Sequence, residues 1–219
     1  PEASGMAKVG DRLFVATQAL DRDGGFEPTR NGVLAVVDLT QGALVDVDQA
    51  TDGVQGVELL GTNPVGGVMV TDDGLLVASA GSFAVRDEAG IERVSAEPPF
   101  NSTWIVREDA LEGDISGFVA SPDGDTFYIV VAVLSADEMG FATALKRYNV
   151  STDTVTEVLR TEGFDLGDVA LTSDGTRVLL SDRTATDPRL RVYDLATGDE
   201  VGSVSTMLPP SKLMPLGRP

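Results

Sequence analysis

The chain has 219 residues, with 35 acidic and 16 basic side chains and neither histidine nor cysteine. The net charge of -19 argues against a nucleic-acid partner, because binding a phosphate backbone requires clustered lysine and arginine. The missing histidine removes the commonest general base, and the missing cysteine removes thiolate chemistry, disulfides and structural zinc. Carboxylate chemistry, serine or lysine nucleophiles and oxygen-bound Ca²⁺ or Mg²⁺ remain open.

Apolar residues make up 42% of the chain, which indicates a globular protein with a sizeable core. The longest apolar run, residues 127–134, is far shorter than the roughly 18 to 20 residues of a membrane-spanning helix. We therefore expect no transmembrane segment.

The first part of the chain, residues 1–60, has two apolar runs joined at Gly10-Asp11 and a further Val-rich run that begins at Leu34. A glycine in such a turn supplies the positive φ that a tight hairpin needs. Between these runs lies the acidic segment 21–27.

The segment 21–27 resembles part of a Ca²⁺-binding loop, because Asp21, Asp23 and Glu27 flank a glycine pair. Alternate carboxylates on a bent loop can converge on one hard cation. The full EF-hand pattern is not met, since Gly25 stands where a third oxygen-bearing side chain belongs. The alternative is a solvated loop between two strands, and Ca²⁺ is the one cofactor that this segment suggests.

The second part, residues 61–110, repeats the pattern more weakly, with a turn at Asp73-Gly74 and an apolar run at Gly90-Ile-Glu-Arg-Val. Helix signals are poor throughout the chain. Residues 107–113 are predicted to form at most one turn of helix.

The third and fourth parts, residues 111–161 and 162–206, are the clearest copies. Phe118-Val-Ala-Ser-Pro-Asp-Gly-Asp-Thr-Phe-Tyr-Ile aligns with Val169-Ala-Leu-Thr-Ser-Asp-Gly-Thr-Arg-Val-Leu-Leu, so that Gly124 corresponds to Gly175. In both parts a second pair of runs follows, centred on Arg147-Tyr-Asn-Val and Arg191-Val-Tyr-Asp-Leu.

Each part therefore predicts two hairpins, or four strands, over about 45 to 60 residues. We expect an all-β fold, a β-propeller of four-stranded antiparallel blades with about four blades visible in residues 1–206. The ring is expected to be a closed ring of four blades, an incomplete one, or one completed by a partner. The Pro-rich segment 207–219 is expected to be a C-terminal tail or the start of a further blade. A β-sandwich with regularly spaced turns is the alternative fold.

Loops equivalent to segment 21–27 occur at residues 80–89, 135–143 and 182–188, and all should emerge on one face of the ring. Their acids would make that face anionic and suit a cationic ligand or protein patch, although such loops are more often only solvated. The candidate binding residues are Asp137, Glu138, Asp182 and Asp187.

The segment from Leu166 to Thr206 is similar to the YVTN-type β-propeller repeat of bacterial and archaeal surface-layer and periplasmic proteins. The wider group includes lactonase-like propellers. The resemblance covers residues 1–206, strongly in the last two parts and loosely in the first two. It implies propeller architecture and a periplasmic or extracellular location, and is nearly silent about function.

We therefore predict a non-catalytic extracytoplasmic propeller that serves as a scaffold for protein–protein binding, either alone or as a subunit of a larger assembly. A protein partner or further propeller blades are the expected partners. No catalytic residues are assigned. The alternative is a Ca²⁺-assisted hydrolase or lactonase-like enzyme that uses carboxylates around the central channel.

Overall fold

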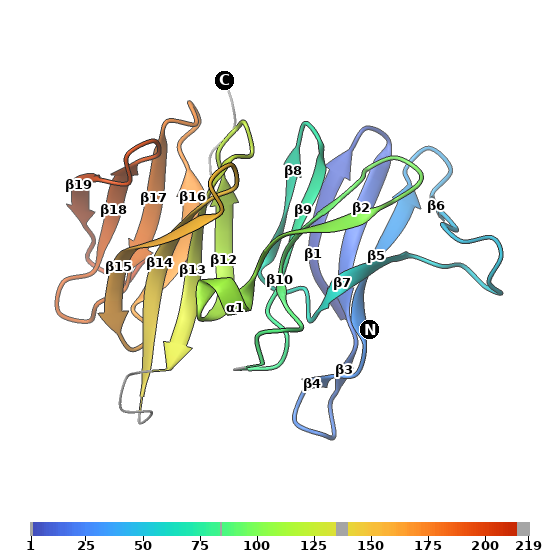
Figure 1. Cartoon of the computed structure of the whole chain (residues 1–219), viewed down its shortest axis with the longest axis horizontal. Helices are drawn as coiled ribbons and strands as arrows, with labels where there is room; N and C mark the ends of the chain where they lie inside the picture. The colour runs from blue at the N-terminus through green and yellow to red at the C-terminus, as the bar shows by residue number, and fades with distance from the viewer. Residues whose placement is uncertain (1, 84, 135–139, 214–219) are drawn as a thin grey trace. The chain divides into compact units, whose positions relative to one another are not determined.

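The computed structural model describes residues 2–83, 85–134 and 140–213. The chain forms two compact units, residues 1–110 and 111–219, and each unit contains two antiparallel sheets built from consecutive strands (Figure 1). Among the residues that the structure describes, no helix is long and apolar enough to span a membrane.

The first sheet of the first unit, called sheet 1, has the order β1-β2-β5-β6, and β7 also pairs with β5. Its outermost strand is thus made of two pieces, because residues 45–56 leave the sheet between β6 and β7. The strands are β1 (Glu2–Val9), β2 (Arg12–Gln18), β5 (Asn31–Asp38), β6 (Ala43–Leu44) and β7 (Val57–Thr62). A separate small hairpin of β3 (Leu20–Asp21) and β4 (Glu27–Pro28) lies between β2 and β5 in the chain.

Sheet 2 completes the first unit with the order β8-β9-β10-β11. Its strands are β8 (Gly67–Thr71), β9 (Gly74–Ser79), β10 (Gly90–Val94) and β11 (Ser102–Arg107). Sheets 1 and 2 pack face to face over an apolar cluster that includes Phe14, Leu34, Leu75 and Val77. The innermost strands of the two sheets approach closely, because a Cβ on Gly5 would lie 3.2 Å from Val68 Cγ2.

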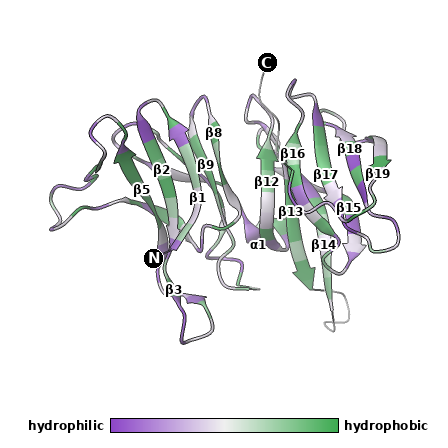
Figure 2. Ribbon diagram, turned by 180° about the vertical axis from the view of Figure 1, so that it is seen from behind, coloured by the Kyte–Doolittle hydropathy of each residue, from purple (hydrophilic) through white to green (hydrophobic). Residues whose placement is uncertain are grey.

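The second unit repeats this arrangement with sheets 3 and 4. Sheet 3 contains β12 (Asp114–Ala120), β13 (Thr126–Leu134), β14 (Phe141–Asn149) and β15 (Thr154–Glu162). Sheet 4 contains β16 (Leu166–Leu171), β17 (Arg177–Asp182), β18 (Arg189–Asp194) and β19 (Glu200–Ser205). The cluster between these sheets includes Tyr128, Leu145, Leu180 and Tyr193, and Figure 2 shows the hydrophobic colouring of β13 and β14.

The short helix α1 (Glu108–Leu111) confirms the prediction of at most one helical turn within residues 107–113. The prediction of an all-β fold of four-stranded antiparallel blades is also confirmed.

The turns differ from the prediction in detail. Gly10 and Asp11 do form a two-residue turn, because Val9 pairs with Arg12. The turn at Gly124 is longer: the Ser121 N–H donates to the Thr126 carbonyl, which leaves four residues in the loop. The Thr172 N–H and Arg177 carbonyl enclose Gly175 in the same way. Serine and threonine hydroxyls, which the sequence argument did not weigh, bond to these loops and favour the longer form.

Sheet 1 is apolar on both faces. Its strands alternate strictly, so that one face buries Phe14 and Leu34 against sheet 2 while the residues between them point the other way. That second face, the open face of sheet 1, is half-buried or exposed along its whole width. It consists of Met6, Leu13, Val15, Val33, Ala35, Val37 and Leu44.

Sheet 4 has a similar open face on the side away from sheet 3. Its residues alternate with the buried Val178, Leu180 and Tyr193 and are again half-buried or exposed. It consists of Leu179, Leu190, Val192 and Val204. The side chain at its outer edge, Val204, is 59% exposed.

Candidate functional site

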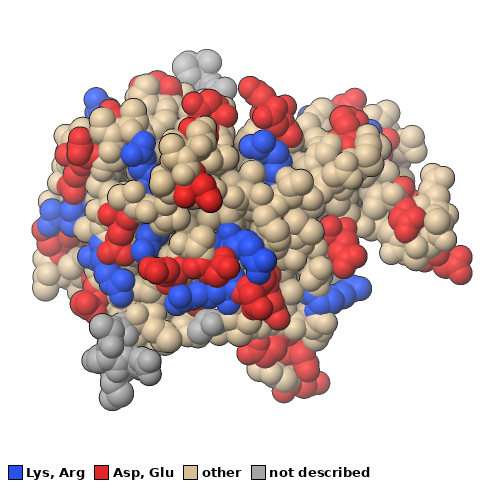
Figure 3. All heavy atoms as spheres, in the orientation of Figure 1, with Lys and Arg blue, Asp and Glu red and all other residues tan. Residues whose placement is uncertain are grey.

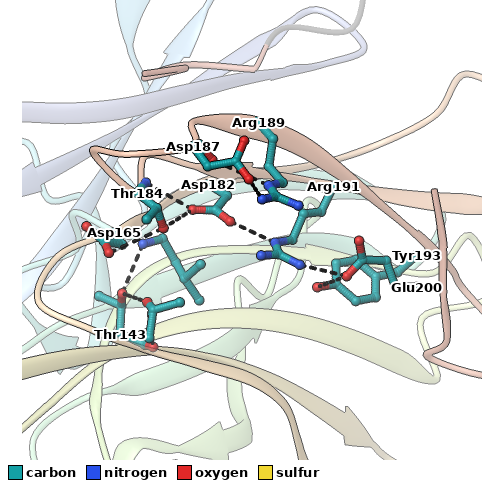
Figure 4. Close-up of polar contacts among 11 residues, drawn as sticks. Thr143, Asp165, Asp182, Thr184, Asp187, Arg189, Arg191, Tyr193 and Glu200 are labelled. Carbon is teal, nitrogen blue, oxygen red and sulfur yellow. Dashed lines mark hydrogen bonds and ion pairs between the residues drawn. The ribbon is translucent and has the colours of Figure 1, made fainter. Parts of the chain in front are cut away.

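A polar network runs across sheet 4 on the face that packs against sheet 3 (Figure 4). At its centre is Asp182, the last residue of β17, which is fully buried. Its carboxylate accepts hydrogen bonds from the backbone N–H of Thr184 at 3.0 Å and from the Thr184 hydroxyl at 2.6 Å. The Nε of Arg191 donates to the other oxygen at 2.8 Å. Arg191 also pairs with Glu200 at 2.8 Å, so one guanidinium joins two carboxylates.

The network fixes the charge of its members. Burial opposes the ionisation of Asp182, but the hydrogen bonds from Thr184 and Arg191 outweigh it and lower the pKa of this carboxyl group. Burial likewise opposes the charge on Arg191, yet its two carboxylate partners raise the guanidinium pKa. Burial, together with the nearby Glu200 carboxylate, raises the pKa of Tyr193 to about 12. None of these groups is poised to exchange a proton near neutral pH, so the network supports the sheet rather than acid–base chemistry.

The four candidate binding residues of the predicted loops therefore differ in their surroundings. Asp182 lies inside the sheet packing, which corrects the expectation that it belongs to an exposed loop, because Thr184 and Arg191 hold its carboxylate inward. Asp187 is half-exposed and pairs with Arg189. Asp137 and Glu138 lie outside the described residues. As a binding set, the four stay a prediction.

A second buried acid, Glu92 in β10, was missed by the sequence argument. Its carboxylate accepts hydrogen bonds from the backbone N–H groups of Leu60 at 2.9 Å and Gly61 at 3.1 Å, and from the hydroxyl of Ser102. Those two amides belong to β7, where its pairing with β5 is interrupted. The only sequence signal was a glutamate at an inward-facing position of the run Gly90-Ile-Glu-Arg-Val. Burial raises the pKa of Glu92 despite these three donors.

The segment proposed for Ca²⁺ forms the β3–β4 hairpin, in which Asp21 pairs with Glu27. The Asp21 carboxylate accepts the backbone N–H of Asp23 at 3.1 Å and of Gly24 at 3.0 Å, so it stabilises its own turn. In the described ranges, no three or more Asp, Glu, His or Cys residues gather in a way that could hold a metal ion. The Ca²⁺ site at Asp21, Asp23 and Glu27 stays a prediction, as does the Ca²⁺-assisted enzyme.

The first unit also has an open groove of about 920 Å³ between the loop 45–56 and the segment 98–101. Val47, Val54 and Phe100 give it apolar walls, while Arg30 and Glu58 place charges at its sides. Residues of the strands β5 and β7, Val33 and Val57 among them, also line the groove.

The surface as a whole carries both signs of charge. Figure 3 shows acidic and basic side chains interspersed on the face that it displays. Several exposed aspartates are used in their own turns: Asp174 accepts hydrogen bonds from Thr172 and Thr176, which lower its pKa, and Asp194 accepts the N–H groups of Ala196 and Thr197. Much of the acidity therefore serves loop structure.

No family model matches the sequence, and no curated protein matches it. The resemblance to the YVTN-type repeat is thus not confirmed at the level of a family. Among solved structures, the chain is similar to hydrazine synthase from Kuenenia stuttgartiensis, with a TM-score of 0.51 and 16% identity over 93% of this chain and 49% of that one. It is also similar to an auxiliary nutrient binding protein from Bacteroides thetaiotaomicron, with a TM-score of 0.56 and 12% identity over 96% and 43% of the two chains.

Likeness at such low identity shows the fold alone. The chain spans less than half the length of these two solved structures. Solved structures similar to this chain are β-propeller-like proteins, and the fold of this chain is accordingly that of β-propeller blades.

Proposed function

We propose that this protein is a non-catalytic β-propeller scaffold that binds other protein chains through the open faces of sheet 1 and sheet 4. The observation that carries the proposal is that both sheets are apolar on the side where no other described sheet of their unit covers them. Contiguous apolar surface on a folded protein marks a protein interface more often than chance exposure does.

The chemistry of the two faces supports a dry protein contact. The strand β2 contributes Leu13 and Val15 to one face, and β18 contributes Leu190 and Val192 to the other. β-Branched and leucine side chains on a pleated surface are suited to packing against another sheet at about 10 Å. Two charged side chains also lie on the first face, Lys8 opposite Leu13 on the edge strand β1 and Glu58 opposite Val33 in β7.

The buried acids support a scaffold rather than a reaction centre. Asp182 and Glu92 are each held by donors within their own unit, and their hydrogen bonds stabilise the packing of neighbouring strands. Such fixed interiors give the rigid framework that a binding surface needs.

We further propose an extracytoplasmic location, which rests on the similarity of residues 166–206 to repeats of surface-layer and periplasmic proteins. Fractionation of cells that make the protein tests this: recovery in the periplasm or medium is expected, and recovery in the cytoplasm alone would contradict it.

The binding proposal is tested by affinity capture from an extract of the same cells. Val15→Lys and Leu190→Glu place a charge on each open face, and Phe26→Lys changes an exposed residue of the separate β3–β4 hairpin as the matched control. We expect at least one protein, a second copy of this chain included, to be retained by the wild type and the control and lost with both face variants. Identical sets of retained proteins for all four chains would refute the proposal.

A further inference from the structure

We propose that the partner on these two faces is a second copy of this chain, with the open face of sheet 1 of each copy packed on the open face of sheet 4 of the other. The inference rests on the proposed function and names the partner for it. It follows from the strand positions that are buried in the two observed interfaces, one between sheets 1 and 2 and one between sheets 3 and 4.

In the second unit, sheet 4 packs on sheet 3 through Leu180, which lies five residues after the turn glycine Gly175. In sheet 1, the residue five positions after the turn glycine Gly10 is Val15, a member of the open face. The open face of sheet 1 therefore occupies the same positions as the face of sheet 4 that is buried against sheet 3.

The opposite faces correspond in the same way. Sheet 3 contributes Leu145 to its interface with sheet 4, and Leu145 pairs with Val130, six residues after Gly124. In sheet 4, Leu190 pairs with Ser181, six residues after Gly175, and belongs to the open face. The open face of sheet 4 therefore matches the face of sheet 3 that is buried against sheet 4.

The first unit uses the same positions again. Leu34 pairs with Ala16, six residues after Gly10, and is buried in the cluster between sheets 1 and 2. In both units, the face that carries the residue paired with the sixth position after the turn glycine is therefore buried against the next sheet. That residue is Leu34 in sheet 1 and Leu145 in sheet 3. The open face of sheet 4 occupies these same positions, and the open face of sheet 1 occupies the positions that pack against them, so a second copy of the chain supplies a complement for each.

The residues of sheet 1 at the centre of the proposed contact, Val15 and Ala35, carry no charge. In sheet 4, the position across from Leu180 is Arg191, which needs Asp182 and Glu200 as partners. In sheet 1, the position across from Val15 is Ala35. An interface formed by Val15, Ala35 and their neighbours therefore requires no buried ion pair.

Two copies joined in this way form two equivalent contacts. Each copy offers both open faces, so a two-fold axis relates the two contacts. The product has eight sheets, which lies within the four to eight blades typical of propellers.

Sedimentation equilibrium of the 219-residue chain gives the first test. We expect a mass twice the 22.9 kDa of one chain. Val15→Lys and Leu190→Glu, each alone, should raise the dissociation constant of the dimer by more than about 30-fold, because a charge is then buried at the centre of the contact. Phe26→Lys, in the separate β3–β4 hairpin, should leave the mass unchanged.

Mixing the two face variants gives the decisive test. In a mixed dimer, the lysine introduced at position 15 of one chain faces the glutamate introduced at position 190 of the other, while the second contact is unaltered. We therefore expect Val15→Lys and Leu190→Glu chains to form a dimer together although neither does so alone. Recovery on mixing also shows that both variants are folded.

The remaining outcomes are distinct. Absence of recovery on mixing, with both variants keeping the wild-type strand content by circular dichroism, overturns the head-to-tail arrangement. A wild-type chain that is monomeric at every concentration, while its faces still retain a different protein, overturns the second-copy proposal and leaves the proposed function standing. A monomer whose faces retain no protein overturns both.

Discussion

Glu92 in the first unit and Asp182 in the second are both fully buried carboxylates, and the two units hold them by different means. In the first unit, Glu92 accepts hydrogen bonds only from uncharged groups, and its pKa is raised by burial. In the second unit, Asp182 also receives the guanidinium of Arg191, and its pKa is lowered. At Asp182 the two donors of Thr184, together with the guanidinium of Arg191, outweigh burial, whereas at Glu92 the uncharged donors do not.

The difference has a structural origin. Glu92 bonds to amides of β7 that the interrupted pairing with β5 leaves without strand partners. Asp182 bonds across a regular strand pair, β17 with β18, where Arg191 lies two residues beyond Arg189, the register partner of Asp182. The first acid completes a broken hydrogen-bond ladder, whereas the second balances a charge.

Spectroscopy can follow the two units separately. The single tryptophan, Trp104, lies in β11 of the first unit and pairs with Glu92 in the strand register. All three tyrosines, Tyr128, Tyr148 and Tyr193, lie in the second unit. Tryptophan fluorescence therefore reports the first unit and tyrosine absorbance the second.

Removal of the cation should have the largest effect. Arg191→Met leaves the buried Asp182 with only Thr184 as a donor, and should lower the free energy of unfolding by about 2 to 3 kcal/mol. Urea denaturation followed by tyrosine absorbance measures this. Arg189→Met is the matched control, because its partner Asp187 is half-exposed, and it should cost no more than about 0.5 kcal/mol. Equal losses for both variants would show that Asp182 does not depend on Arg191.

Removal of Glu92, which is held by uncharged donors, should lower the free energy of unfolding somewhat less. Glu92→Ala leaves the amides of Leu60 and Gly61 without an acceptor, and should lower the free energy of unfolding by about 2 kcal/mol. Urea denaturation followed by Trp104 fluorescence is the measurement. Glu92→Gln keeps one acceptor oxygen and should recover about half of the loss. If the alanine variant is as stable as the wild type, Glu92 is not needed to hold β7.

The two acids should also give opposite responses to pH. Asp182 has a lowered folded pKa, so its contribution is present above the unfolded value of 3.8 and is lost as pH falls through the folded value. Glu92 has a raised folded pKa, so its contribution is complete below 4.5 and is lost as pH rises from there through the folded value. We expect acidification from pH 7 to pH 3 to weaken the tyrosine-reported unit first.

The pH response has a direct control in Glu92→Gln, which cannot ionise. Comparison with the wild type by Trp104 fluorescence should show a stability difference that changes between pH 4.5 and neutrality. A difference that is constant over this range would contradict the raised pKa.

A smaller effect is expected from a hydrogen bond between sheets 3 and 4. The Tyr128 hydroxyl donates to the carbonyl of Leu195 at 2.9 Å and lies 3.2 Å from that of Asp194. Tyr128→Phe keeps the ring packing and should lower the free energy of unfolding by about 1 kcal/mol in thermal or urea denaturation. An unchanged midpoint would mean that water replaces the hydroxyl without cost.

The sequence was sufficient to predict the sheets, because turn glycines and Val-rich runs repeat along the chain. The alignment of Gly124 with Gly175 placed the strands of sheets 3 and 4 in matching order. It was not sufficient for the buried acids. Asp182 looked like a loop residue, since nothing local shows that Arg191, nine residues later, reaches back to it across the strand pair.

The open faces could not be predicted from the sequence for a related reason. Val15 and Phe14 are neighbours in one apolar run, and only the strand alternation together with the position of sheet 2 shows which of them is buried. An apolar run predicts a strand with two apolar faces. It does not show which face a neighbouring sheet covers.

The central claim, that the faces of sheets 1 and 4 join two copies into one ring, is tested most directly by counting blades. Electron microscopy of the purified chain, averaged in projection along the ring axis, gives that count. We expect particles of eight blades, four from each of two copies. Particles that contain the four sheets of a single chain would contradict the claim.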